Sequence, residues 1–183
     1  MNWLNTILIL AVAWLAIFLE ATFSGVRNLI GAQIDLLPGL MVYAGLTRGL
    51  GALALIAVAS GLGFDAMSAN PFGVSVLPLF LIGWLVHFKR QLILREEFFA
   101  QLMLGLGASA IAPVMVLLLI QASGLQPLVG WGTLWQWLVM SAVGGMITPF
   151  YFLLFGRIQR ALNYEPVSEG GYQPNREIKR GRS

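Results

Sequence analysis

The sequence predicts an all-α membrane protein built as a bundle of transmembrane helices. Of its 183 residues, 58% are hydrophobic and 10% are charged, and the mean hydropathy is +0.80. Soluble domains are about 45–50% apolar and about 25% charged. The apolar residues form long runs rich in Leu, Ala, Gly, Val and Ile, without the strict alternation of barrel strands. Composition therefore excludes a soluble globular domain and a disordered chain.

Six apolar runs are the expected membrane spans. They cover residues 3–23, 36–47, 49–64, 72–88, 98–120 and 133–155. Because one span needs about 20 residues, a chain of this length has room for five or six helices and for no soluble domain. The first run has no basic segment before it and is long for the apolar core of a signal peptide, so we expect it to remain as the first span.

Arg48 decides whether the second and third runs form one helix or two. Only twelve residues separate Asp35 from Arg48, about 18 Å of helix against a hydrocarbon core of about 30 Å. A fused helix would place Arg48 near the middle of the membrane, at a cost of about 2.5–3.5 kcal/mol. The flanking residues Gly45, Gly49 and Gly51 favour a turn instead. We therefore expect two short helices and six spans, with five spans as the alternative.

The basic residues predict the orientation. Six spans with a cytoplasmic N-terminus place ten of the eleven Lys and Arg residues in the cytoplasm, and only Arg27 outside. The five-span alternative also places ten on that side, so charge does not separate the two topologies. Both give a cytoplasmic C-terminus and an outer interface at Trp131, Trp135 and Trp137.

The end of the chain differs in composition from the rest. Residues 163–183 are polar and charged, without apolar periodicity. We expect residues 1–162 to form the transmembrane bundle and residues 163–183 to be a disordered cytoplasmic tail. The basic end of this tail either contacts anionic lipid of the bilayer or is simply solvated.

The sequence contains no recognisable set of residues for catalysis or for metal binding. It has no cysteine and one histidine, His87, which we expect to be solvated at the membrane interface. It also lacks a Gly-x-Ser-x-Gly elbow and a phosphate-binding loop. We therefore expect a protein that is not an enzyme and that has no cofactor, no metal and no nucleic-acid partner.

Three acidic residues lie close to the membrane. Glu20, Asp35 and Asp65 all fall toward the outer ends of the expected spans. A proton relay needs several polar groups that converge inside a bundle, so capping of a helix or contact with a partner is the favoured interpretation.

Small residues recur at a spacing of four in residues 45–49, 59–63 and 105–109. This spacing lets helices approach closely. Packing within the bundle is the simpler interpretation, and a groove for a partner helix along Ala59 and Gly63 is the alternative. Pro113 and Pro149 are expected to bend the last two helices.

Residues 35–73 contain a recognisable order of features. Asp35 opens a short helix that ends at Arg48-Gly49, a glycine-rich helix ends in Gly61-Leu-Gly-Phe-Asp65, and a turn follows at Pro71-Phe72-Gly73. This order resembles the rod shape-determining protein MreD family. The resemblance is specific over about a quarter of the chain and is compositional elsewhere.

The resemblance implies a non-catalytic subunit of the machinery that elongates rod-shaped bacteria, located in the cytoplasmic membrane. It implies MreC, a single-span protein with a large periplasmic part, as the partner, with MreB, RodA and the elongation transpeptidase nearby. It also implies a fold similar to the substrate-binding subunits of energy-coupling-factor transporters, so a substrate-binding subunit for vitamin uptake is the alternative function. The candidate structural or partner-contact residues are Asp35, Arg48, Gly49, Ala59, Gly63, Asp65, Pro71 and Gly73.

Overall fold

The computed structural model describes residues 2–22, 31–68, 70–91, 97–125 and 130–162, and these form six α-helices and no strand. The helices are α1 (Asn2–Thr22), α3 (Leu37–Thr47), α4 (Leu50–Met67), α5 (Val76–Lys89), α6 (Phe98–Ala122) and α7 (Trp131–Leu162). The all-helical prediction is confirmed, with one helix in each apolar run. The expected tail, residues 163–183, and Arg27 lie outside the described residues.

Two helix boundaries differ most from the sequence prediction. Helix α5 begins at Val76 rather than at residue 72, because Pro71 and Gly73 take part in a turn whose carbonyls accept the N–H groups of Val74 and Val76. Helix α7 continues to Leu162 rather than ending at residue 155. Both α6 and α7 run without interruption through their internal prolines.

Four of the helices, α1, α4, α6 and α7, are long and apolar enough to cross a membrane. This finding indicates a membrane protein. Helices α3 and α5 have 11 and 14 residues, about 16 and 21 Å at 1.5 Å per residue, less than a hydrocarbon core of about 30 Å. Two of the six expected spans are therefore shorter than a full crossing.

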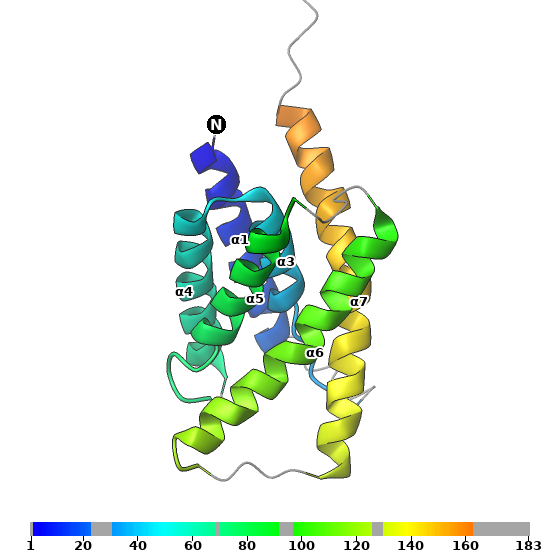
Figure 1. Ribbon diagram of the computed structural model, residues 1–183. Helices are drawn as coiled ribbons and strands as arrows, with labels where there is room; N and C mark the ends of the chain where they lie inside the picture. The colour runs from blue at the N-terminus through cyan, green and yellow to red at the C-terminus, as the bar shows by residue number, and fades with distance from the viewer. Residues whose placement is uncertain (1, 23–30, 69, 92–96, 126–129, 163–183) are drawn as a thin grey trace, which may run out of the picture.

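Helix α3 occupies the centre of the bundle (Figure 1) and contacts each of the other five helices. All residues from Leu37 to Leu46 are buried. A helix that is apolar on every side is stable when other helices surround it. The apolar surroundings of α3 are therefore the other five helices rather than lipid.

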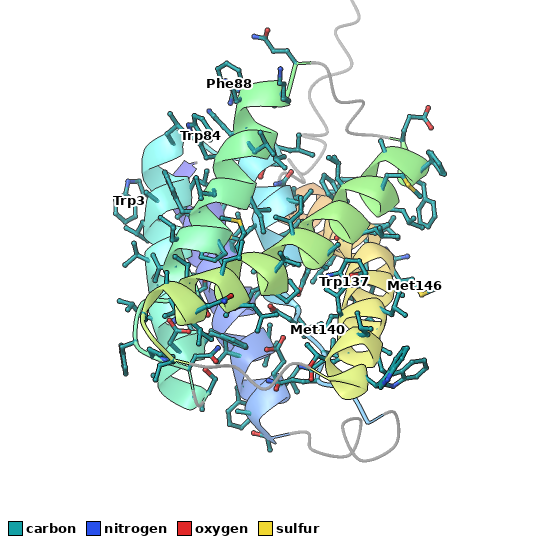
Figure 2. All side chains as sticks on the ribbon, turned by 60° about the horizontal axis from the view of Figure 1, so that its bottom comes forward. Trp3, Trp84, Phe88, Trp137, Met140 and Met146 are labelled. Atoms are coloured by element: carbon teal, nitrogen blue, oxygen red, sulfur yellow. The ribbon has the colours of Figure 1, made fainter. Side chains whose placement is uncertain are left out.

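Successive helices run in opposite directions, so the start of α1 and the end of α7 lie at the same end of the bundle (Figure 1). The outer surface carries large apolar side chains. Trp3, Trp84, Phe88 and Met146, which are labelled in Figure 2, are each at least 43% exposed. Such a surface suits lipid rather than water.

The helical conformation is interrupted at Arg48, between α3 and α4. Helix α3 ends at Thr47, and Arg48 is extended, with φ −113° and ψ 162°, while its N–H donates to the carbonyl of Ala44 at 2.8 Å. Helix α4 begins at Leu50 after Gly49, which has φ −80°. The fused helix of the five-span alternative is therefore wrong. Other residues also adopt a negative φ of this size, so the backbone conformation at position 49 does not require glycine.

The two ends of the bundle differ in charge. The end at the top of Figure 1, here called the basic end, holds Arg48, Lys89, Arg90, Arg157 and Arg160, together with Glu97. The opposite end, here called the acidic end, holds Glu20, Asp35 and Asp65.

The glycine-rich segments pack helices against one another, in agreement with the simpler interpretation of their spacing. A Cβ on Gly45 would lie 2.6 Å from the carbonyl oxygen of Gly83 in α5, and one on Gly61 would lie 2.8 Å from Cα of Val76. In α6, a Cβ on Gly105 would overlap the side chain of Thr148 in α7. Only glycine allows the helices to approach this closely at these points.

Candidate functional site

A partly open cavity of about 1130 Å³ lies at the acidic end of the bundle. Its walls come from the ends of α1 and α4, residues 32–36, the start of α5, the second half of α6 and the first half of α7. Helices α6 and α7 pack closely where Gly105 meets Thr148, and α6 crosses obliquely to the far side of the acidic end (Figure 1). This divergence leaves room for the cavity.

The cavity is mainly apolar, with polar groups on part of its wall. Trp137 and Met140, which are labelled in Figure 2, lie on the part of α7 that borders it. The indole N–H of Trp137 donates to the carbonyl of Ala110 in α6 at 2.8 Å. The polar or acidic lining residues are Glu20, Gln33, Asp35, Ser68, Asn70, Ser75, Thr133 and Gln136.

Two carboxylates of the cavity wall bind the first turn of α3. Oε1 of Glu20 accepts a hydrogen bond from the N–H of Leu36 at 2.6 Å, and Oδ1 of Asp35 accepts one from the N–H of Leu37 at 3.0 Å. The first N–H groups of a helix have no partner within the helix, and Pro38 has no N–H to satisfy. The start of α3 is thus capped by these two side chains.

Burial makes ionisation of these two carboxyl groups unfavourable. Burial raises the pKa of the Asp35 carboxyl to about 6, although the hydrogen bond from Leu37 acts in the opposite direction. The second oxygen of Glu20, Oε2, is buried and has no hydrogen-bond partner among the described residues. The hydroxyl of Tyr151 in α7 donates to the carbonyl of Leu36 at 3.2 Å, so α1, α3 and α7 meet at this point.

Asp65 joins the end of α4 to the start of α5. Its side chain is 2% exposed and accepts two hydrogen bonds from Ser75, one from the N–H at 3.1 Å and one from the hydroxyl at 2.5 Å. Between them lies the turn with Pro71 and Gly73, where Gly73 has φ +87°, a conformation that other L-residues rarely adopt. Asp65, Pro71 and Gly73 therefore form one corner, here called the α4–α5 corner.

All three acids accept a hydrogen bond from a backbone N–H at the start of a helix, in agreement with the capping interpretation. Sequence reasoning did not single out Ser75 or Tyr151. The position of Ser75 directly before an apolar helix was a usable signal, because serine is a common residue there. No local pattern connects Tyr151 with Leu36, which is 115 residues away.

The remaining candidates lie elsewhere. Arg48 is 8% exposed at the basic end, and its Nε has no hydrogen-bond partner among the described residues. Gly49 beside it is exposed. Ala59 is half-buried on α4, and a Cβ on Gly63 would lie 3.2 Å from the ring of Trp14 in α1. The eight candidates are thus spread over both ends and the side of the bundle.

His87 is half-buried. The expectation that it is solvated at the interface is therefore wrong in part. Its Nδ1 lies 3.1 Å from the carbonyl oxygen of Gly45, so it links the end of α5 to α3. In the part of the chain that the structure describes, no three His, Asp or Glu side chains are grouped so that they could hold a metal ion.

Comparison of the chain with protein-family models, with curated proteins and with solved structures gives no match.

Proposed function

We propose that this chain is a non-catalytic integral membrane subunit of the bacterial cell-elongation machinery, of the MreD type. In this role it binds the single-span protein MreC through helix faces and supports peptidoglycan synthesis along the lateral wall. One observation carries the proposal: most residues of the MreD-like pattern lie where one helix is joined to the next. Asp35 caps α3, Arg48 and Gly49 separate α3 from α4, and Asp65 closes the α4–α5 corner.

The positions of these residues support the proposal because together they define how α3, α4 and α5 are connected. Helices α3, α4 and α5 contact one another, and the pattern from Asp35 to Gly73 marks the start of the first and both connections. A resemblance carried by such residues is therefore a resemblance in how three helices are connected. It differs from a likeness in apolar composition, which many membrane proteins share.

The charge distribution supports an orientation with the basic end in the cytoplasm of the bacterial inner membrane. With this orientation, all six helices cross or enter the bilayer. The last turn of the short α5 holds His87 and Lys89, and Arg90 follows it. Long basic side chains at a helix end can extend to the interface when the helix itself ends below it. The buried α3 needs no contact with lipid.

Recovery of MreC with the purified chain tests the proposal. We expect this single-span partner to co-purify from membranes of the native bacterium. Ala59→Leu is expected to lower its recovery at least threefold without a change in thermal stability, because Ala59 is only half-buried on α4 and a bulky side chain obstructs a close helix contact. Gly63→Leu is the comparison: it is expected to lower stability as well, because of the contact with Trp14. A chain recovered without MreC contradicts the proposal.

The second candidate is a substrate-binding subunit for vitamin uptake, and the cavity is the observation that favours it. Its volume of about 1130 Å³ is sufficient for a ligand of vitamin size, since ligand pockets measure about 300–1,000 Å³. This function requires thermal stabilisation by a vitamin and recovery with an ATPase-linked module. Those two results, with normal cell shape after deletion, would replace the first proposal by the second.

A further inference from the structure

We infer that the cavity at the acidic end binds a small organic cation, with an ammonium group near Glu20 and Asp35 and an apolar body along α6 and α7. The inference concerns the cavity alone and does not depend on the proposed role in cell elongation.

The first argument is the sign of the charge. Glu20 and Asp35 both line the cavity, and none of its described lining residues is Lys, Arg or His. The start of α3 compensates only part of this charge, because a helix N-terminus is equivalent to about half a positive charge. Ionisation of even one of the two carboxyls therefore leaves this described part of the wall negative. A cleft of one sign concentrates ions of the other sign.

The second argument is unused hydrogen-bonding capacity. A carboxylate has about four acceptor sites, and Glu20 and Asp35 each accept one bond from the start of α3. The buried Oε2 of Glu20 has no partner among the described residues. A carboxyl at this position is stabilised in its ionised form by a partner of opposite sign, which an ammonium group at the wall supplies.

The third argument is the rest of the lining, which selects against other ligands. Phe64, Met67, Trp137 and Met140 contribute apolar surface, and an aromatic face also attracts a cation. A bare metal ion requires several oxygen ligands at close range, and the described residues offer no group of three acids or histidines. An anion is repelled by the acidic part of the wall, and a neutral ligand supplies no counter-charge to the carboxyls.

The absence of cysteine makes a direct test possible. Ser68→Cys places one thiol in the cavity wall, beside Glu20. Ser123→Cys is the matched control, because both serines follow the last residue of a helix, α4 and α6, at the acidic end, and Ser123 does not line the cavity. Each purified full-length variant in lipid nanodiscs is treated at pH 8 with two methanethiosulfonates, one with a trimethylammonium group and one with a sulfonate. The thiolate attacks the reagent, forms a mixed disulfide and releases methanesulfinate.

We expect the ratio of cationic to anionic labelling rates to be at least about tenfold higher at position 68 than at position 123. In the Ser68→Cys chain, Glu20→Gln with Asp35→Asn is expected to lower the ratio to the control value. The ammonium probe 4-phenylbutylamine is expected to slow labelling at position 68, and the neutral 4-phenylbutan-1-ol is not. This last comparison keeps both carboxylates and so remains decisive even where their replacement unfolds the chain.

Equal ratios at the two positions overturn the inference. So does equal protection by the amine and the alcohol, or a thiol at position 68 that neither reagent reaches until the protein is denatured. All of these measurements use the purified chain alone. Their failure is therefore separate from failure of the proposed function, which depends on a partner and on cell shape.

Discussion

Gly105→Ala is expected to destabilise the bundle by about 2–3 kcal/mol, the upper range for overpacking a well-packed core. The added Cβ would overlap the side chain of Thr148, which is fully buried, and would lie 2.8 Å from the carbonyl oxygen of Gly144. The backbone of α7 has to move away from α6, and the close contact that fixes the two helices is then lost. Unfolding in denaturant, followed by tryptophan fluorescence in detergent, measures the change.

Gly107→Ala is the matched control for this prediction. Gly107 lies two residues away in the same helix, and a Cβ there would meet nothing within 4 Å. Its replacement is expected to leave stability within about 1 kcal/mol of the original, in the direction of stabilisation, because alanine favours a helix more than glycine does. Equal stabilities of the two variants would show that α6 and α7 do not approach as described.

Asp65→Ala is expected to cost about 3–6 kcal/mol, the sum for two hydrogen bonds to a carboxylate. The change removes the acceptor of two hydrogen bonds from Ser75, and bonds to a charged group contribute about 1.5–3 kcal/mol each. It also leaves the N–H of Ser75 buried without this partner, because Ser75 is 5% exposed. The same unfolding measurement checks the loss.

Glu97→Ala is the comparison for Asp65→Ala. Glu97 is an exposed acid directly before α6, and its removal is expected to change stability by less than about 0.5 kcal/mol. The double variant Asp65→Ala, Ser75→Ala should cost less than the sum of the two single changes, because both remove the hydroxyl contact. Additive costs would contradict the α4–α5 corner as described.

The helices themselves could be predicted from the sequence because each is an apolar run ended by charged, glycine or proline residues. The break at Arg48 followed from the cost of a buried charge beside flexible residues, and α3 does end at Thr47. The turn at Pro71 and Gly73 followed from the preference of proline and glycine for turns, and Gly73 has a positive φ. These features depend on local chemistry, which the sequence displays directly.

The central position of α3 and the cavity could not be predicted in this way. All six runs are apolar, and composition does not say whether a helix faces protein or lipid. The cavity depends on the angle at which α6 leaves α7, and that angle depends on contacts between residues about forty positions apart, such as Gly105 and Thr148. The sequence indicated that Asp35 lies at the start of α3, but only the fold brings Glu20 from the end of α1 to the same place.

Depletion of the chain in the organism that encodes it tests the proposed role in cell elongation most directly. The account predicts that cell width increases and that cells become round within a few generations, and that a plasmid copy of the gene restores rods. A copy with Glu20→Gln and Asp35→Asn is a useful comparison, because its effect on shape shows whether the cavity serves elongation. Cells that keep their width after complete loss of the chain would contradict the account.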